Sequence, residues 1–324
     1  MKILITGVHG FVGSNLVKAL SKEHAIYGLD IVSPVKDGVR YTFSWDDLEK
    51  GNMIPEVDAI IHLAGMAHDT KNQSKADLYF KVNTDLTKKI FEHFLASKAK
   101  KFIFFSSVKV AADRVEGEFV DENVIPKPKG PYAESKIAAE RYIFSKFSDK
   151  SLVLRDSGEP TDKKTYVLRP CMIHGPGNKG NLNLLYGVVK KGIPWPLGAF
   201  ENKRTFTSID NLCYIIQGLL AKDVESGIYN INDDEAVSTN ELIEIICSVM
   251  GKKAHIWRIP RGLMEGLAKL GGLLHLPLNP ERLQKLTENY VSSNAKIKKI
   301  LGVEQLPVRA KDGLRKTIES FENE

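Results

Sequence analysis

The residues of this sequence best suited to chemistry are Tyr132 and Lys136, which stand four positions apart within residues 130–136. On a helix this spacing places both side chains on one face, one turn apart. A phenol usually loses its proton at about pH 10, and an ammonium group beside it favours the phenolate. We therefore expect Lys136 to lower the pKa of Tyr132, so that the phenol works as an acid or base near neutrality. The pattern alone is weak, because Tyr-x-x-x-Lys occurs by chance in many helices.

A glycine-rich turn near the start of the chain gives this pair its context. The apolar run 3–5 fits a buried strand, and apolar residues then repeat at helical spacing through residues 12–20. Gly7, Gly10 and Gly13 stand between the two, with Phe11 and Val12 beside them. Glycines let the backbone approach a pyrophosphate, and a helix N-terminus offers free N–H groups and partial positive charge. The segment predicts a dinucleotide site, although three glycines can also form a plain tight turn.

The second predicted strand, residues 25–29, ends in Asp30. A carboxylate at this place can accept a hydrogen bond from a ribose 2′-hydroxyl and repels a 2′-phosphate. The sequence therefore favours NAD over NADP as the cofactor. The alternative is that Asp30 only caps a loop.

Composition sets the size and class of the protein. The chain has 324 residues, 43% of them hydrophobic, which is enough for one large α/β domain and a smaller lobe with a full core. The net charge is +6, but the lysines are dispersed, so no nucleic-acid partner is predicted. Such a modest excess of positive charge suits an anionic small ligand.

The three cysteines, Cys171, Cys213 and Cys247, are far apart and odd in number. They suggest neither a disulfide framework nor a metal site, and we expect a reducing, cytoplasmic environment. No apolar stretch approaches the ~20 residues that cross a membrane, so no membrane insertion is expected. Residues 263–278 are fairly apolar but interrupted; we interpret them as a helix packed on the lobe, with an interface role as the alternative.

Strand and helix patterns alternate through the first half of the chain, which indicates a parallel sheet covered on both faces. We predict a Rossmann-type, doubly wound α/β domain over residues 1–170. Its further strands are 39–43, 59–64, 101–106 and 165–169, its main helices are 76–97 and 131–147, and 155–164 is a loop.

Beyond residue 170, prolines and glycines cluster in 174–177 and 192–198. We predict that residues 171–324 form mainly a smaller α/β lobe that binds substrate, with an approximate and discontinuous boundary. Ser238 and Glu241 form a capping box before a clear helix at 242–246.

Ligands of open parallel sheets bind beyond the carboxyl ends of the strands. The glycine turn, Asp30, Ser106, Ser107 and Pro170 each follow a predicted strand, and Tyr132 begins a helix at the same edge. Distant segments that meet at one edge are stronger evidence of a site than any single motif.

At this point the sequence resembles the extended short-chain dehydrogenase/reductase superfamily, in its branch of NAD-dependent nucleotide-sugar epimerases, dehydratases and reductases. The matching segments occur in family order over residues 1 to about 240; they are Thr6-Gly7-x-x-Gly10-x-x-Gly13, His62-Leu63-Ala64-Gly65, Val82-Asn83, Phe105-Ser106-Ser107, Tyr132-x-x-x-Lys136, Arg169-Pro170, Gly175-Pro176-Gly177 and Arg204-Thr205-Phe206 with Asp210.

The resemblance implies a role for each matching residue. Tyr132 would be the catalytic acid or base, Lys136 would hold the nicotinamide ribose, and Ser107, chosen over Ser106 by its distance to Val110, would bind the reacting sugar oxygen. The cofactor would be bound by Gly7, Gly10, Phe11, Val12, Gly13, Asp30, Leu63, Ala64, Gly65, Lys136 and Pro170. The substrate would be bound by Ser107, Tyr132, Asn181, Arg204 and, in a looser alignment, Arg282.

Plainer interpretations of these residues stay open. Ser107 can be an ordinary serine at a strand end, Arg204 a surface arginine, and Asn181 a turn residue. His62 lies in a predicted buried strand, where a packed core histidine is commoner than a ligand. We predict no metal site.

One departure from the family pattern narrows the reaction. Dehydratases of this branch carry an Asp-Glu pair directly after the serine or threonine, whereas this chain has Val108 and Lys109. Dehydration is therefore not expected. Ser106 to Val110, together with 180–182, resembles a branch that acts on UDP-linked N-acetylamino sugars in bacterial polysaccharide pathways.

The sequence leaves three hypotheses. The first is a 4-epimerase of a UDP-hexose or UDP-N-acetylhexosamine that uses NAD. The alternative is an NAD(P)H-dependent reductase of a UDP-4-keto-6-deoxy-N-acetylhexosamine. The third, a dinucleotide sensor without activity, is disfavoured by the intact Ser107, Tyr132 and Lys136. The resemblance also implies a homodimer.

Overall fold

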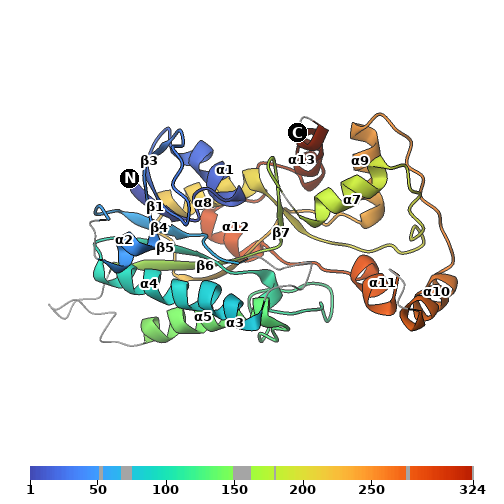
Figure 1. The fold of residues 1–324 in the computed structure, drawn as a ribbon, viewed down its shortest axis with the longest axis horizontal. Coiled ribbons are helices and arrows are strands. Elements are labelled where there is room, and N and C mark those ends of the chain that lie inside the picture. Colours follow the sequence, from blue (N-terminus) through green and yellow to red (C-terminus); the bar gives the residue numbers. More distant parts are fainter. Residues whose placement is uncertain (51–53, 67–74, 149–161, 179, 275–277, 323–324) are drawn as a thin grey trace.

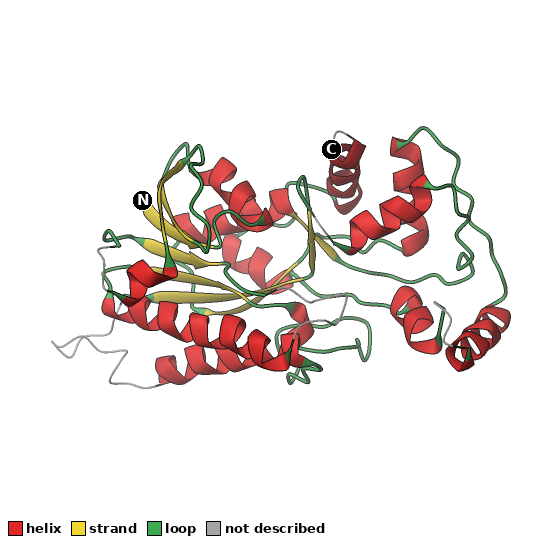
Figure 2. Cartoon of the chain, in the orientation of Figure 1, coloured by secondary structure: helices red, strands yellow, loops and turns green. Residues whose placement is uncertain are grey.

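The structure is a computed structural model that describes residues 1–50, 54–66, 75–148, 162–178, 180–274 and 278–322 (Figures 1 and 2). The greater part of the predicted loop 155–164, namely residues 155–161, lies outside the described residues.

A sheet of seven parallel strands forms the centre of the first domain, with the strand order β3-β2-β1-β4-β5-β6-β9. Its strands are β1 (Lys2–Thr6), β2 (Ala25–Leu29), β3 (Val39–Phe43), β4 (Ala59–His62), β5 (Lys101–Phe105), β6 (Lys164–Pro170) and β9 (Gly227–Ile231). The order reverses between β1 and β4, which places the ligand crevice of a doubly wound sheet beyond the carboxyl ends of these two strands. The predicted fold class is confirmed.

Helices cover both faces of this sheet, as Figure 1 shows. One layer is α1 (Phe11–Leu20), α8 (Ile209–Ala221) and α12 (Ala295–Leu301), and the other is α4 (Leu86–Ala96) and α5 (Pro131–Ser148). Alternate strand residues face opposite layers: Ile3 and Ile5 pack with the α1 and α8 cluster, whereas Leu4 packs with the α4 and α5 cluster. The apolar runs of the sequence are strands buried on both faces.

The smaller lobe has its own core. Strands β7 (Met172–His174) and β8 (Phe206–Ser208) pair in parallel, and the helices are α7 (Asn181–Lys190), α9 (Thr239–Val249), α10 (Arg261–Leu273), α11 (Pro280–Thr287) and α13 (Ala310–Glu322). The capping box forms as predicted, because Ser238 Oγ accepts from the Glu241 N–H at 3.1 Å while Glu241 accepts from the Ser238 N–H at 2.8 Å.

Segments from the C-terminal half complete the first domain. Strand β9 is the edge strand beside β6, and helices α8 and α12 pack on the same sheet. The lobe is therefore interrupted by residues that return to the sheet, and a division at residue 170 stays an approximate prediction.

The predicted helix 76–97 is one continuous helix that changes from α-helical to π-helical and back. It consists of α3 (Ala76–Tyr79), a π-helical segment (Phe80–Asp85) and α4. The π segment carries the buried Asn83, whose Oδ1 accepts from the Met66 N–H at 2.7 Å and whose Nδ2 donates to Ser135 Oγ at 3.0 Å. Such π segments often mark functional sites, and this one ties the loop after β4 to the first turns of α5.

Two short elements complete the description: α2 (Trp45–Glu49) and a 3₁₀ turn (Val108–Val110) after β5. The apolar segment 263–278 contains α10, and residues 275–277 lie outside the described residues. None of the helices within the described residues is long and apolar enough to cross a bilayer.

Candidate active site

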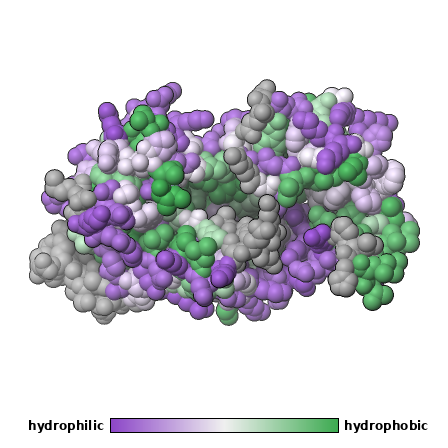
Figure 3. Space-filling model, in the orientation of Figure 1, coloured by the Kyte–Doolittle hydropathy of each residue, from purple (hydrophilic) through white to green (hydrophobic). Residues whose placement is uncertain are grey.

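A pocket of about 1710 Å³ opens between the carboxyl edge of the large sheet and the smaller lobe. The surface is visibly hollowed there in Figure 3. The glycine turn after β1, the residues after β4 and β5, and the start of α5 form one side of the pocket. The lobe contributes α7, the segment around Arg204, and one face of α11 to the other side.

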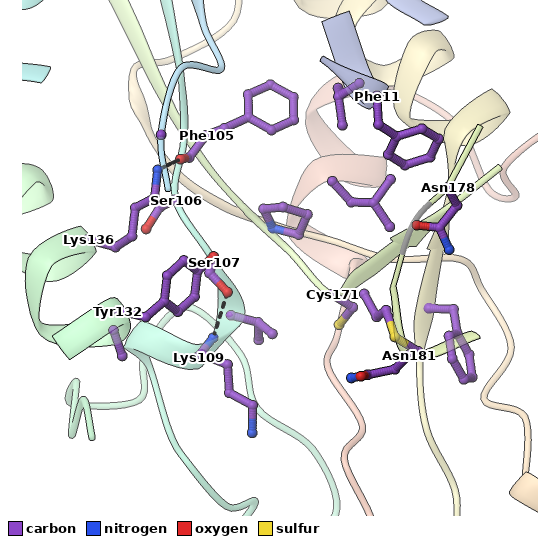
Figure 4. A pocket seen from close by; sticks show the side chains of 18 of the residues that line it. Phe11, Phe105, Ser106, Ser107, Lys109, Tyr132, Lys136, Cys171, Asn178 and Asn181 are labelled. Carbon is purple, nitrogen blue, oxygen red and sulfur yellow. Dashed lines mark hydrogen bonds between the residues drawn. The ribbon is translucent and has the colours of Figure 1, made fainter. Parts of the chain in front are cut away.

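The predicted catalytic residues come together on one wall of this pocket (Figure 4). Ser107 follows β5, Tyr132 is the second residue of α5, and Lys136 lies one turn further along that helix. The Ser107 hydroxyl lies near the Tyr132 phenol and accepts a hydrogen bond from the Lys109 N–H at 3.3 Å. The Lys136 ammonium donates to the main-chain oxygen of Phe105 at 2.9 Å. Residues about 25 positions apart in the chain thus form one cluster.

The two neighbouring serines have different partners. Ser106 Oγ donates to the Glu140 carboxylate at 2.5 Å, and Glu140 also holds the Arg169 guanidinium through contacts of 3.0 and 2.6 Å. This ion pair is almost fully buried. The Ser106 hydroxyl therefore bonds into the core, and Ser107 is the serine left near the phenol; its catalytic role stays a prediction.

The electrostatics of the Tyr132–Lys136 pair differ from the sequence-based expectation. Burial raises the pKa of Tyr132 above its usual value, and the nearby Ser107 hydroxyl acts in the opposite direction. Burial also lowers the pKa of Lys136 to about 8, although the nearby Glu140 opposes this shift. The expected lowering of the phenol pKa by Lys136 is thus not found without cofactor, because desolvation of the phenolate outweighs the stabilising contacts.

The glycine turn fits a dinucleotide pyrophosphate. Gly7 has φ +70°, and a Cβ there would lie 3.1 Å from the Ala64 nitrogen. A Cβ on Gly13 would lie 2.4 Å from the Gly7 oxygen, so a side chain at either position would disturb the turn. Helix α1 begins at Phe11 and Val12 with no side-chain cap and no acidic residue in its first turn. Its first N–H groups are therefore suited to bind phosphate oxygens.

The residues after β4 lie between this turn and the catalytic wall. Leu63 and Gly65 line the pocket, and the Ala64 N–H donates to Thr6 Oγ1 at 3.0 Å. A Cβ on Gly65 would lie 2.9 Å from Lys136 Nζ, so this position has room only for glycine while Lys136 keeps its place. Pro170, at the end of β6, also lines the pocket.

Asp30 lies beside the glycine turn. Its carboxylate accepts from the His9 N–H at 3.0 Å and from the Ile31 N–H at 2.7 Å. This position at the end of β2 suits contact with a ribose hydroxyl. The Lys36 ammonium is close enough to interact with the Asp30 carboxylate. Burial, and after it the charge of Lys18, lower the pKa of Lys36, whereas Asp30 raises it.

The predicted substrate residues divide into two groups. Asn181 and Arg204 line the pocket, and Figure 4 shows Asn181 across the cavity from Tyr132. The Arg204 guanidinium donates to the main-chain oxygens of Lys285 and of Glu288, the latter at 3.4 Å. The structure does not bring Arg282 to the pocket wall: among the described residues that line it, α11 contributes Glu281, Gln284 and Lys285 instead.

Lys109 is a pocket residue to which the sequence analysis gave no role. Its ammonium lies 4.3 Å from the centre of the Tyr290 ring and donates to the main-chain oxygen of Asp113 at 3.0 Å, and burial lowers its pKa. The only sign in the sequence that Lys109 belongs to the site was its position, which an acidic residue occupies in the dehydratases. Its partner Tyr290 comes from the far end of the chain and gave no local signal.

His62 is the packed core residue that was expected. Its ring nitrogens contact the hydroxyls of Thr6 at 2.7 Å and Thr87 at 2.9 Å, and its pKa lies well below the usual value because the ring is buried. No group of three or more His, Cys, Asp or Glu side chains arranged to hold a metal ion occurs within the described residues.

Known proteins share both the sequence pattern and the fold. The chain is 31% identical over 280 residues to the UDP-glucose 4-epimerase of Vibrio cholerae, which covers 80% of this chain and 78% of that protein. It is 26% identical over 314 residues to the N-acetyl-alpha-D-glucosaminyl-diphospho-ditrans,octacis-undecaprenol 4-epimerase of Escherichia coli O157:H7, covering 94% and 86% of the two chains. In the solved structure of UDP-glucuronic acid 4-epimerase from Bacillus cereus in complex with NAD, the fold matches with a TM-score of 0.74 at 20% identity, over 100% of this chain and 99% of that one.

The family model described as the NAD dependent epimerase/dehydratase family matches residues 3–232, which include the glycine turn, Ser107, Tyr132 and Lys136. This match confirms the predicted superfamily and NAD as the family's cofactor. The chain is an enzyme that belongs to the NAD-dependent epimerase/dehydratase family.

Proposed function

We propose that the protein is a 4-epimerase that acts on a UDP-hexose or a UDP-N-acetylhexosamine. The observation that carries the proposal is that Ser107, Tyr132 and Lys136 lie together in the same pocket as the dinucleotide turn. The names of the Vibrio cholerae and Escherichia coli relatives support the choice of reaction, because both are 4-epimerases of sugars joined to a diphosphate.

The chain's own groups suggest how the reaction proceeds. Ser107 binds the oxygen on C4 of the sugar, and Tyr132 removes the proton of that hydroxyl as C4 is oxidised. When bound, NAD supplies the two-electron acceptor that oxidation at C4 requires. The 4-keto sugar then turns over in the pocket and is reduced on its opposite face, while Tyr132 returns the proton.

Lys136 is proposed to act at two places. Its ammonium is fixed by the Phe105 carbonyl, which leaves its remaining donors for the ribose hydroxyls of the dinucleotide. Burial raises the pKa of Tyr132, and the positive charge of an oxidised nicotinamide would favour the phenolate when the cofactor is bound. Proton removal by Tyr132 would therefore depend on a bound cofactor in its oxidised form.

The opposite wall is proposed to hold the diphosphate and the nucleoside. Asn181, Arg204 and Lys285 line this side, and Lys109 adds a further cation to the pocket from the turn after β5. Cationic groups give charge-assisted hydrogen bonds to phosphate oxygens. Arg204 already donates hydrogen bonds to main-chain oxygens at the carboxyl end of α11. It would therefore hold that helix in place as well as bind phosphate.

A 4-keto reductase is the second candidate, because the same three residues can donate a proton to a 4-keto sugar. The test is to incubate purified protein with UDP-glucose and with UDP-GlcNAc, without added cofactor, and to follow the C4 epimers by NMR. Epimer formation by the wild type but not by Tyr132→Phe supports the proposal. Failure with both sugars, with NAD added as well, and NAD(P)H oxidation with a UDP-4-keto-6-deoxy sugar would replace it by the reductase.

The homodimer stays a prediction.

A further inference from the structure

Helix α10 has two apolar faces. On one face, Met264 and Ala268 are buried against Leu197 and Leu283. On the other side, four leucines of the helix and the leucine at its C-cap are between 45% and 76% exposed; they are Leu263, Leu267, Leu270, Leu273 and Leu274. In Figure 3 hydrophobic surface gathers at the end of the molecule where Figure 1 places α10. An apolar patch of this kind on a protein surface marks a binding face.

The leucines form a stripe rather than a scatter. Leu263, Leu267, Leu270 and Leu274 follow the three- and four-residue spacing that aligns side chains along a helix. Glu265 and Lys269, which are exposed, lie on the remaining surface. The solvent-exposed surface of α10 is therefore itself divided into an apolar and a polar part, in addition to the apolar face that is packed against the lobe.

The surroundings of the stripe are basic. Residues 257–287 contain five Lys or Arg residues and two Glu residues, and one of the acids, Glu281, is paired with Lys285 at 2.8 Å. Arg258 lies shortly before the helix, and Arg261 is its first residue; both are exposed. Trp257, which is 56% exposed, lies beside them. Leucines with a tryptophan and flanking cations are the composition of helices that lie in the headgroup layer of a membrane.

We propose that α10 docks on the surface of an anionic lipid bilayer, with its leucine stripe in the headgroup layer. The helix has 13 residues, a length of about 20 Å, whereas a spanning helix must cross a hydrocarbon core of about 30 Å. It therefore lies in the plane of the membrane. A second copy of the chain is the less suitable occupant, because it would bring the same excess of positive charge around its own stripe rather than a complementary negative charge.

Docking at α10 would place the pocket beside the membrane. Leu283 of α11 packs against α10, while Glu281, Gln284 and Lys285 of the same short helix line the pocket. The bilayer would thus lie close to the α11 side of the pocket and away from the far edge of the sheet at β3. This proposal does not depend on which sugar is the substrate, and its test needs no activity.

The test is co-sedimentation of the full-length protein with vesicles of phosphatidylcholine, with and without a quarter of phosphatidylglycerol. We expect the wild type to sediment with the anionic vesicles, less with the neutral ones, and less at high salt. In the double variant Leu267→Glu/Leu270→Glu the partition coefficient should fall about tenfold or more, because two apolar contacts are lost and two negative charges are added.

Leu184→Glu is the matched control, since Leu184 is a 64% exposed helical leucine on α7 and does not line the pocket. It should bind vesicles like the wild type, and all three proteins should show the same circular dichroism spectrum. Absence of wild-type binding to anionic vesicles would overturn the proposal, as would equal binding by the double variant. A change from dimer to monomer in the double variant, without vesicle binding by the wild type, would identify a second copy as the occupant instead.

Discussion

Lys136 donates a hydrogen bond from its ammonium to the main-chain oxygen of Phe105, with an Nζ–O distance of 2.9 Å. Phe105 is the last residue of β5, and Ser107 follows two positions later. The same contact therefore fixes α5 against the end of the strand that carries the serine. Lys136 is almost completely buried, so its hydrogen bond to this carbonyl offsets part of the cost of burying the ammonium charge. We infer that Lys136 positions the Tyr132–Ser107 pair as well as the cofactor.

The first prediction concerns the acid–base role of Tyr132. Tyr132→Phe removes the phenolic oxygen but keeps the ring, which contacts Tyr79 edge-on at a centroid distance of 6.3 Å. We expect kcat to fall by about 10²–10⁴-fold, the usual contribution of a positioned acid or base. The affinity for NAD should change by only a few-fold, as measured by isothermal titration calorimetry. Near-normal turnover in this variant would remove Tyr132 from the mechanism.

The second prediction separates the two serines. Ser107→Ala should lower kcat by about 10²-fold, because a hydrogen bond to the reacting oxygen is lost. Its thermal stability should fall less than that of Ser106→Ala, because Ser107 loses only its 3.3 Å contact with the Lys109 N–H. Ser106→Ala is the matched control. It removes a partner of the buried Glu140 carboxylate and should reduce the free energy of unfolding by about 1–3 kcal/mol, with a smaller effect on kcat. The assignment fails if the two variants show the reverse pattern in assays and melting curves.

The third prediction uses the pKa of Lys136, which burial lowers to about 8 in the folded protein. The unfolded side chain has a pKa of about 10.4, so between these values the unfolded state binds more protons than the folded state. This group therefore makes the cofactor-free protein more stable as the pH rises from about 8 to about 10.

Lys136→Met should remove this contribution. The free energy of unfolding in urea, compared between wild type and variant, should show a difference that changes by a few kcal/mol, at most about 3, over that pH range. Other titrating groups affect both proteins alike and cancel in the comparison. A difference that is constant across the pH range would show that Lys136 is not held in the folded state with a lowered pKa.

The fourth prediction concerns cofactor choice. Asp30→Ala removes the carboxylate beside the glycine turn, which would repel a 2′-phosphate, while Lys36 remains nearby. The ratio of NADP to NAD dissociation constants should fall by about tenfold or more, since a single charge contact is worth roughly 1–2 kcal/mol at a partly exposed site. Fluorescence titration of both cofactors measures the ratio. An unchanged ratio would mean that Asp30 does not contact the ribose.

The sequence predicted the features that depend on local patterns. Apolar runs identified six of the seven strands of the sheet, the glycine spacing identified the turn before α1, and Ser238 with Glu241 identified the start of α9. Parallel strands bring their carboxyl ends to one edge, so the meeting of Ser107, Tyr132 and Lys136 followed from topology. The choice of Ser107 over Ser106 is supported by the Ser106–Glu140 contact.

Features that depend on contacts between distant segments could not be predicted from the local sequence pattern. The π segment around Asn83 follows from hydrogen bonds to Met66 and Ser135, so helix propensity over 76–97 gave no sign of it. Strand β9 joins the sheet by pairing with β6, whose residues lie about 60 positions earlier. The pKa of Tyr132 was expected to be lowered, because the sequence shows the nearby lysine but not the burial of the phenol.

The most direct measurement of the proposed chemistry uses UDP-glucose that carries deuterium at C4. If Tyr132 removes the hydroxyl proton while C4 is oxidised and then reduced on its other face, the C4 epimer must keep its deuterium at C4. We predict complete retention by NMR and mass spectrometry, together with a slower rate than with the unlabelled sugar. Deuterium appearing in the solvent, or an epimer with hydrogen at C4, would contradict the account.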